Sequence, residues 1–456
     1  MVIVETAHEL DLFLSKLRVD SCIVDVVMCD VEKHALNNLP SLIITIFPAQ
    51  GDLWVIPISH NEGLSLDGSL DKVRENLKMC MGRKCTFDKK TLVHVFGEDC
   101  GFVDLNVVKY LDTGCFEEFE DVSNSASVFI SGTFRRFSNL NKSIPIMKHC
   151  DLFMQKYLKF VFPPKETSFD KSFEFVNNIA ITRFAELERI GIAVDKEKLI
   201  LQFGEEQEKN VKNNLIYSQY NLFTSTGRPS NRFGGVNYAA LNKTDGSRNL
   251  FVSRHGPDGM LVMIDYSAFH PRLITRLINY QMGFDVNPYE YLAKHFFKKK
   301  NVSMKEIGET KGYTFQQFYG GIQQRWAHIP YFKKIQEYID HRWQYFEANG
   351  FVETPVYFRK IKECHIENPS PNKLFNYILQ AYETEIGVLT LGRILDHLKG
   401  RLTQPTLYTY DSLLFDAHRQ DGQETIRQLR DIMVDNKFPV KVYVGKNYAE
   451  MSQIEL

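Results

Sequence analysis

The chain has 456 residues, too many for a single hydrophobic core, so the length predicts roughly two to four structural units. Its hydrophobic content of 44% and its charged content of 24% are ordinary for a soluble globular protein. The net charge of -1 excludes an overall basic balance. Any nucleic-acid partner must therefore be held by local basic surfaces.

The cysteines and the first residues predict a location in the reducing interior of a cell. The eight cysteines form no CxxC pair and no zinc-like spacing, so free thiols in a reducing cytoplasm are the simplest interpretation. The start, "MVIVETAHELDLFLSKLRVD", has early acids and no basic segment followed by an apolar one, so no secretory signal is expected. No apolar run approaches the roughly 20 residues of a membrane span. We expect a soluble, intracellular protein with no membrane partner.

Residues 1–165 alternate short apolar runs with turns and helical stretches. The runs "SCIVDVVM" and "SLIITIFPAQGDLWVIPIS" predict strands, and "FPAQGDLW" predicts the turn of a hairpin. Together they indicate a mixed sheet with helices. The prolines and polar residues of "FVFPPKETSFD" then predict a linker, and we expect a domain boundary there, near residue 165.

From about residue 170 the hydrophobic period becomes helical, and Gly191 marks the expected end of the first helix. "GMLVMIDYS" predicts a strand, and residues 273 to about 350 predict mainly helices. "GFVETPVYFRK" indicates a strand pair, "NKLFNYILQAYETEIGVLTLGRILDHL" a long amphipathic helix, and "TLYTYDSLLFDAH" a hairpin. A helix over 422–435 and the strand "PVKVYVG" complete the pattern.

Two aspartates interrupt apolar strand patterns. Asp265 ends "LVMIDYSAFHPR" at a buried-looking strand, and Asp411 lies within "LYTYDSLLFD". Each alone is most simply a turn former or a helix N-cap. A pair of them on separate apolar strands would instead suit Mg²⁺, which binds one or two carboxylates together with phosphate oxygens. Two such ions can activate an attacking oxygen and stabilise a leaving one, and they would remove the cost of burying both charges.

A third segment, "SMKEIGETKGYTFQQFYGG", places a cation and two rings at helical spacing. It begins with a capping-box pattern, from Ser303 to Glu306. Lys311, Phe315 and Tyr319 follow four residues apart and share one helix face. The simple interpretation is a lysine stem packed beside two aromatic residues. The functional interpretation is that the lysine binds a triphosphate and the rings bind a base.

Taken in order, the residues from about 174 to the end resemble the family A DNA polymerases, the class of bacterial repair polymerases and many phage replicases. "ELERIGIAVDKEKL" is similar to the start of the family's polymerase domain, and "TSTGRPSNRFGGVNYAALN" to its Thr-x-Thr-Gly-Arg-x-Ser loop. "IDYSAFHPR" is similar to motif A and "KGYTFQQFYGG" to motif B, while "TYDSLLFD" stands where motif C is expected. "NYILQ" resembles the helix that reads the minor groove, and "FPVKVYVGKNYAEM" resembles the last strand and turn.

The resemblance implies an α/β (α+β) right-hand fold. The palm would be residues 223–272 and 375–456, with the fingers, 273–374, inserted between them, and residues 166–222 would form a reduced thumb with connecting helices. The implied activity is template-directed addition of deoxynucleotides to a primer 3′-hydroxyl, in DNA replication or repair. Primer-template DNA and deoxynucleoside triphosphates would be the partners, and two Mg²⁺ ions, or Mn²⁺, the cofactors.

The resemblance also implies roles for individual residues. Asp265 and Asp411 would be catalytic and would hold both metal ions. The expected nucleotide-binding residues are Lys311, Phe315, Tyr319, His270 and Tyr266. The expected DNA-binding residues are Arg228, Asn237, Arg272, Asn376 and Gln380.

Three positions depart from the family's motifs. In motif A, His270 replaces a glutamate that packs against the sugar and helps to exclude ribonucleotides. In motif B, Ile307 replaces an arginine, so further triphosphate contacts would come from elsewhere, such as Lys305 or Arg325. In motif C, Ser412 stands where a second acid is usual, so the expected metal site has two carboxylates.

The thumb is expected to be short. Between Leu199 and Thr224 there is room for one or two short helices, where the family has a long helical pair that grips the duplex. We therefore expect a weak, salt-sensitive grip on DNA, which a processivity factor or other replisome protein would remedy. The compact size and the reduced thumb resemble those of a virus-encoded enzyme. The implied location is the cytoplasm of a bacterial or virus-infected host cell.

Residues 20–155 resemble the family's ribonuclease H-like 3′–5′ exonuclease domain, which would occupy residues 1–165. The alignment offers three metal-binding acids, Asp25, Asp88 and Asp151. The fourth acid, a glutamate, is replaced by Val27, and the tyrosine of the third motif by Met147. We expect a degenerate, structural domain with lost or weak exonuclease activity, in which Glu32 is the only nearby acid that could substitute.

Two alternatives to a DNA polymerase stay open. A polymerase that also accepts ribonucleotides is compatible with His270. A non-catalytic scaffold could keep the fold to bind DNA or protein. The retention of Asp265, Asp411 and Lys311 together argues against the scaffold, because a scaffold has no use for two such acids.

Overall fold

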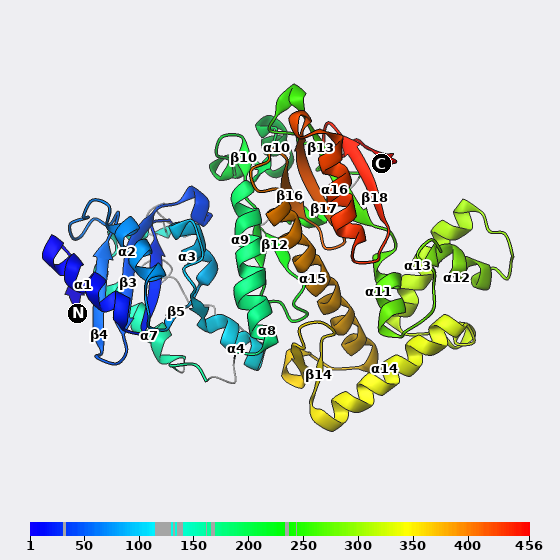
Figure 1. Cartoon of the computed structure of the whole chain (residues 1–456), viewed down its shortest axis with the longest axis horizontal. Helices are drawn as coiled ribbons and strands as arrows, with labels where there is room; N and C mark the ends of the chain where they lie inside the picture. Colours follow the sequence, from blue (N-terminus) through cyan, green and yellow to red (C-terminus); the bar gives the residue numbers. More distant parts are fainter. Residues whose placement is uncertain are drawn as a thin grey trace. The chain divides into compact units, whose positions relative to one another are not determined.

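The computed structural model describes residues 1–30, 33–114, 129–130, 133–134, 140–160, 162–165, 169–232, 237–242 and 244–456. The chain divides into two compact units, whose elements are labelled in Figure 1. The first unit comprises Met1–Gly191, Phe203–Gln219 and Arg232–Val236, and the second Ile192–Gln202, Tyr220–Asn231 and Asn237–Leu456. The first unit thus extends beyond the boundary expected near residue 165.

A mixed sheet lies at the centre of the first unit. Its strands are β1 (Val2–Ile3), β2 (Cys22–Met28), β3 (Pro40–Phe47), β4 (Asp52–Pro57), β5 (Lys84–Thr86) and β6 (Val103–Asp104). They are arranged in the order β1-β4-β3-β2-β5-β6. The pairs β2–β3 and β3–β4 are antiparallel, and β1–β4, β2–β5 and β5–β6 are parallel. The predicted hairpin around "FPAQGDLW" is confirmed, since β3 and β4 pair on either side of it.

Helices pack on both faces of this sheet because its strands are apolar on both faces. The helices of the first unit before residue 165 are α1 (Ala7–Val19), α2 (Ser69–Lys78), α3 (Lys89–Phe96), α4 (Leu105–Thr113), α6 (Leu140–Ser143) and α7 (Ile146–Leu158), with the short η1 (Ala35–Asn37). Val24 and Val26 share a core with α1, α2 and α3. Ile23 shares a second core with α4 and α7, because successive strand residues point to opposite faces. A small hairpin, β7 (Phe129–Ile130) with β8 (Thr133–Phe134), is also described.

The helix predicted from about residue 170 is present, and it ends at Ile190 with Gly191 as its C-cap, as expected. It runs through α8 (Lys171–Phe173), the π-helix η3 (Glu174–Ala180) and α9 (Ile181–Ile190). α9 packs on α3, which explains why the first unit extends to Gly191. Between Leu199 and Thr224 the structure contains the end of α10 (Lys196–Phe203) and the 3₁₀ helix η4 (Glu205–Asn210), in agreement with the short helices predicted there.

The second unit is built on an antiparallel sheet that draws strands from both predicted palm segments. Its strands are β13 (Gly259–Tyr266), β16 (Gln404–Tyr408), β17 (Ser412–His418), β18 (Val440–Gly445) and β19 (Met451–Ile454). They follow the order β16-β17-β13-β18-β19, so β13 lies between two strands that come more than 140 residues later in the chain. The predicted hairpin "TLYTYDSLLFDAH" is confirmed as β16 and β17.

Helices make up most of the rest of the second unit, which also includes most of α10. They are α11 (Phe269–Leu277), α12 (Pro288–Phe296), α13 (Met304–Gly320), α14 (Pro330–Asn349), α15 (Pro371–His397) and α16 (Gly422–Val434). The strand pair predicted in "GFVETPVYFRK" is β14 (Phe351–Glu353) with β15 (Lys360–Lys362). α15 and α16 lie side by side against the five-stranded sheet (Figure 1). α15 also contacts α11, α13 and α14, so this long helix links the sheet to the helical part of the unit.

The described residues bear on two expectations about the whole chain. The seven cysteines among them are all free thiols, as predicted. In the described part of the chain, no helix combines the length and the apolar character that crossing a membrane requires.

Candidate functional site

Asp265 and Asp411 lie at adjoining ends of two paired strands. Asp265 is opposite Ser412 in the pairing of β13 with β17, and the Tyr266 N–H donates to the Asp411 carbonyl at 2.9 Å. A tight turn precedes β17, closed by the Thr409 N–H donating to the Ser412 carbonyl at 2.9 Å. Within it Tyr410 has a φ of 72°, a left-handed conformation uncommon outside glycine. This turn presents the Asp411 side chain beside the end of β13.

The negative charges of Asp265 and Asp411 raise the pKa of the same two tyrosines. Burial is the main cause of the raised pKa of Tyr289 and of Tyr448, and in each case the negative charges of both Asp265 and Asp411 add to the shift. The pKa of Asp411 is itself raised, first by burial and then by the negative charge of Glu383. The site therefore concentrates negative charge, but the expectation of two buried charges is wrong, since the Asp411 side chain is exposed and that of Asp265 is only partly buried.

The chemistry of this pair fits an oxygen-ligated divalent cation. Carboxylates are the ligands that Mg²⁺ prefers, and a cation would stabilise the ionised form of Asp411, which burial and then the charge of Glu383 disfavour. Ser412 does not replace the missing acid, because its side chain is buried and its hydroxyl hydrogen-bonds the Thr409 hydroxyl. Asp265 and Asp411 are the two residues here that could hold the metal.

The predicted helix face of α13 is present. Its capping box between Ser303 and Glu306 is confirmed. Lys311 Nζ lies 6.0 Å from the centre of the Phe315 ring, and the rings of Phe315 and Tyr319 are parallel, with their centres 5.7 Å apart. Lys311 is exposed, and Tyr319 retains 38% of its exposure. The face is therefore accessible to a ligand that carries phosphates and an aromatic base.

His270 joins α13 to α15. Its Nδ1 lies 2.6 Å from the Tyr319 hydroxyl, and its Nε2 lies 2.9 Å from Glu383 Oε1. Glu383 is 1% exposed and also pairs with Arg228, whose Nε lies 3.0 Å from Oε2. Sequence reasoning missed Glu383. The only signal was its position three residues after Gln380, on the same face of the predicted helix.

Arg228 and Asn237 reach the same group from the segment before β13. The Arg228 guanidinium lies 3.7 Å from the centre of the Tyr410 ring, a short cation–π contact. The Asn237 side chain hydrogen-bonds Tyr410. Both residues thus contact the residue that precedes Asp411.

Asn376 and Gln380 are one turn apart on α15, and Glu383 follows on the same face. Both are partly buried. Asn376 Oδ1 is buried, and no described residue donates a hydrogen bond to it. The helix therefore offers an amide oxygen that still has hydrogen-bonding capacity.

Two other predicted residues are used inside the protein. The Tyr266 ring is buried and stacks on Phe269 at 4.4 Å, and its hydroxyl accepts a hydrogen bond from Asn436 Nδ2 at 2.7 Å. Arg272 is also buried and donates to the carbonyls of Ser267 and Val286 at 3.0 and 2.9 Å. The structure brings neither side chain to the exposed face of α13.

The two residues considered as further triphosphate contacts differ in their surroundings. Lys305 is exposed in the first turn of α13. Arg325 Nε donates to Gln323 Oε1 at 2.8 Å, and its guanidinium lies 5.0 Å from the centre of the Trp326 ring. Arg325 is thus held by neighbours in its own turn.

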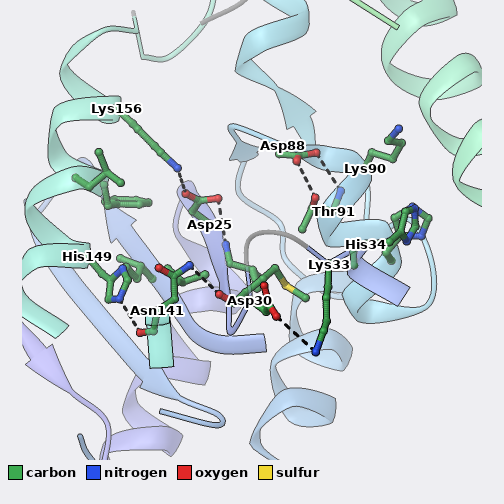
Figure 2. A pocket seen from close by; sticks show the side chains of 18 of the residues that line it. Asp25, Asp30, Lys33, His34, Asp88, Lys90, Thr91, Asn141, His149 and Lys156 are labelled. Carbon is green, nitrogen blue, oxygen red and sulfur yellow. Dashed lines mark hydrogen bonds and ion pairs between the residues drawn. The ribbon is translucent and has the colours of Figure 1, made fainter. Parts of the chain in front are cut away.

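In the first unit, Asp25 and Asp88 line one cavity of about 340 Å³ (Figure 2). Asp25 Oδ2 lies 3.0 Å from Lys156 Nζ, and Asp88 accepts from the backbone and hydroxyl of Thr91 at 3.0 and 2.7 Å as the N-cap of α3. Val27 also lines the cavity, where the exonuclease motif would place a glutamate. Both acids are thus engaged by other side chains of the protein.

The third expected acid of this cavity is placed differently. α7 contributes His149, Leu152, Phe153 and Lys156 to the described lining, whereas Asp151 lies on the exposed side of that helix. Met147 is 54% exposed on the same helix. Glu32 lies outside the described residues. The structure therefore brings together two of the three expected acids, and Lys156 stands beside one of them.

A buried carboxylate, Glu188, forms a second polar cluster at this cavity. His94 Nε2 and Lys90 Nζ each lie 2.7 Å from it, and His34 Nε2 lies 3.6 Å away. These neighbours outweigh the effect of burial, so the pKa of Glu188 lies well below its usual range. Burial lowers the pKa of His94, which Glu188 partly opposes. The cluster joins α9 to α3.

The Glu188 cluster has the composition of a metal site, and the ligand atoms of His34, His94 and Glu188 all lie within 4.8 Å of one another. The hydrogen bonds favour a different interpretation. The Leu36 N–H donates to His34 Nδ1 at 3.1 Å, so in the neutral ring the proton is on Nε2, the atom that faces Glu188. Lys90 already supplies a positive charge to Glu188. We interpret the cluster as a structural ion group.

No family model matches the chain, and no curated protein matches it either. A solved structure does. The POL domain of Pol1 from M. smegmatis, in complex with DNA primer-template and dNTP, is similar with a TM-score of 0.70 and 16% sequence identity, over 98% of this chain and 99% of that chain. The chain has the fold of a family A polymerase domain. The polymerase fold spans both compact units, because the match covers almost the whole chain.

Proposed function

We propose that this protein is a template-directed DNA polymerase that adds deoxynucleotides to a primer 3′-hydroxyl. The proposal is carried by one arrangement within the polymerase fold: Asp265 and Asp411 meet at the ends of paired strands, and both charges act on Tyr289. Tyr319, on the exposed face of α13, also raises the pKa of Tyr289, and the charge of Asp411 raises the pKa of Tyr319 itself. These effects support a site shared by the acids and the α13 face that carries the cation and the rings. An attacking hydroxyl and a triphosphate could meet there.

Each residue of the proposed active site would have its own role. Lys311 would neutralise the triphosphate, and the partly buried ring of Phe315 and the exposed ring of Tyr319 would pack on the sugar and the base. Asp265 and Asp411 would hold divalent cations, which, when bound, would favour deprotonation of the hydroxyl and stabilise the departing pyrophosphate. Arg228, Asn237, Asn376 and Gln380 would position the primer-template through hydrogen bonds and charge.

Several of these roles follow from the electrostatics of the site. The raised pKa of Asp411, caused by burial and by Glu383, makes this carboxylate costly to ionise alone and favours its occupation by a cation. The Lys311 ammonium is exposed and can approach phosphate oxygens. Asn376 Oδ1 is buried and has no partner among the described residues, so the side chain would turn outward to accept a hydrogen bond from a base edge without breaking one inside the protein.

We propose further that the first unit is a degenerate 3′–5′ exonuclease domain with a structural role. Lys156 neutralises Asp25, one of the acids that such a site needs, and Val27 offers no ligand to a metal. Asp88 is engaged as the N-cap of α3. A two-metal nuclease with these features would have one acid paired with a lysine and another replaced by valine.

The short segment between Leu199 and Thr224 supports a weak grip on DNA. It contains the end of α10 and the six-residue η4, and three of the first residues of η4 are glutamates. Such a segment offers little positive charge to phosphates, so we propose that binding to primer-template falls steeply with salt and that a processivity factor assists the protein.

Primer extension on a defined template tests the main proposal. The purified protein is given Mg²⁺ or Mn²⁺, a labelled primer and each single deoxynucleotide in turn, on four templates that differ in the first unpaired base. We expect extension only with the complementary nucleotide. Extension that ignores the template would favour a terminal transferase, and binding of the duplex without any extension would favour the scaffold.

A further inference from the structure

Glu383 is buried on α15, where both His270 and Arg228 contact it, and no motif of the sequence identifies it. We propose that Glu383 is a positioning residue that sets the sugar selectivity of the nucleotide site through His270 and Tyr319. This inference rests on the proposed polymerase function. It decides between the two activities that His270 left open, because it predicts that the protein discriminates strongly against ribonucleotides.

Glu383 determines the tautomer of His270. The Glu383 carboxylate can only accept hydrogen bonds, so His270 Nε2, at 2.9 Å, must carry a proton. In the neutral ring Nδ1 is then an acceptor, and the Tyr319 hydroxyl donates to it across 2.6 Å. Glu383 therefore determines which way the Tyr319 O–H points, from a position that does not touch Tyr319.

The contacts around His270 and Tyr319 hold the two rings in place. The His270 ring is 8% exposed, and its centre lies 6.3 and 6.2 Å from those of Phe315 and Tyr319. On its other side Glu383 forms an ion pair with Arg228, with 3.0 Å between Oε2 and Nε, although the two atoms are not aligned for a hydrogen bond. Hydrogen bonds at both ring nitrogens fix the orientation of the His270 ring. His270 and Tyr319 therefore form a rigid surface, called the wall below, beside the exposed face of α13.

The same contacts would act on the sugar of a bound nucleotide. Burial, and after it the negative charge of Glu383, raises the pKa of Tyr319, so its hydroxyl stays protonated, and that proton is committed to His270. A ribose 2′-hydroxyl placed against this wall would find no free donor, because the Tyr319 proton is used by His270 and the His270 Nε2 proton by Glu383. A deoxyribose presents only hydrogen there. The arrangement therefore favours deoxynucleotides.

The test compares kcat/KM for a deoxynucleotide and its ribonucleotide in single-nucleotide primer extension. We expect the wild type to prefer the deoxynucleotide. Glu383→Gln should reduce the preference by about tenfold or more, mainly by raising kcat/KM for the ribonucleotide, because the neutral amide can accept from or donate to His270 Nε2 and no longer fixes its tautomer. The matched control is Asp396→Asn, an exposed acid on the same helix, which should keep the wild-type preference.

A double-mutant comparison separates this role from a general loss of packing. Tyr319→Phe removes the hydroxyl on which Glu383 acts through His270. The combination with Glu383→Gln should therefore reduce the preference no further than the larger of the two single changes. If the two effects multiply instead, Glu383 acts by another route and the inference is wrong.

A measurement that needs no activity completes the test. In the full chain labelled with ¹⁵N-histidine, the signals of His270, assigned with His270→Gln, should show the Nε2–H tautomer in the wild type and a mixture in Glu383→Gln. A wild type that extends primers but accepts ribonucleotides equally well, or that shows the Nδ1–H tautomer, overturns the inference alone. A wild type that extends no primer overturns the proposed function, whereas the tautomer still reports on the contact between Glu383 and His270.

Discussion

Lys156 Nζ lies 3.0 Å from Asp25 Oδ2, so a lysine from α7 pairs with an acid that the sequence suggests as a nuclease metal ligand. A metal ion would have to displace or repel this ammonium. We therefore expect the wild type to leave a labelled, mismatched primer uncut with Mg²⁺ or Mn²⁺ and no nucleotides. Shortening of the primer that disappears in Asp25→Asn would contradict the proposal of a degenerate domain.

Glu188 is expected to stabilise the first unit. Glu188→Gln removes the charge that compensates the ammonium of Lys90 and that accepts from His94, both at 2.7 Å. Breaking such a buried group should lower the free energy of unfolding by about 3 kcal/mol, measured by urea denaturation. Glu75→Gln, on an exposed helix face, is the matched control and should leave the unfolding midpoint unchanged. Equal midpoints for both variants would contradict the structural role of the Glu188 cluster.

Asp104 should make stability depend on pH. It is 1% exposed, and burial, followed by the negative charge of Asp88, raises its pKa to about 7. In the unfolded chain its pKa is about 3.9. Between these values the folded state keeps the proton and the unfolded state has lost it, so the free energy of unfolding falls as pH rises through this window.

Replacing Asp104 by asparagine removes this titration. The fall in unfolding free energy between about pH 5 and pH 8 should be smaller in Asp104→Asn than in the wild type, whatever the difference in absolute stability. Urea denaturation at several pH values measures this, with Asp71→Asn on the exposed surface as the control. Parallel curves for the wild type and Asp104→Asn would show that Asp104 titrates normally.

Lys311 should act on the nucleotide rather than on the DNA. Lys311→Ala removes an exposed ammonium from the ligand face of α13, and we expect KM for the deoxynucleotide to rise about tenfold because a charge-assisted contact to phosphate is lost. The dissociation constant of the primer-template, measured by fluorescence anisotropy, should stay unchanged. Lys333→Ala, an exposed lysine of α14, is the control. A weakened DNA complex with an unchanged KM would reverse the assignment.

The sequence predicts most of the regular elements because their signals are local. The capping box at Ser303 fixes the start of α13, and Gly191 fixes the end of α9. The apolar runs around Asp265 and Asp411 predict β13 and the hairpin of β16 with β17. These features depend on spacing and turn chemistry within a few residues.

Side-chain directions and distant partners could not be predicted in the same way. A motif resemblance selects Asp265 and Tyr266 together, but successive strand residues point to opposite faces, so Tyr266 is turned into the core. Lys156 meets Asp25 from 131 residues away, and Glu383 meets His270 from 113 residues away. Such pairs arise only when the helices pack on their sheets, and no local pattern reveals them.

The most direct test of the account is the single-turnover rate of primer extension by Asp411→Asn, at saturating primer-template and deoxynucleotide with Mg²⁺. We predict a fall of about a hundredfold or more with unchanged DNA binding, because asparagine keeps the shape of the side chain but removes half of the carboxylate pair. Asp431→Asn, an exposed acid on α16, should react at the wild-type rate. Extension by Asp411→Asn at the wild-type rate would contradict the account.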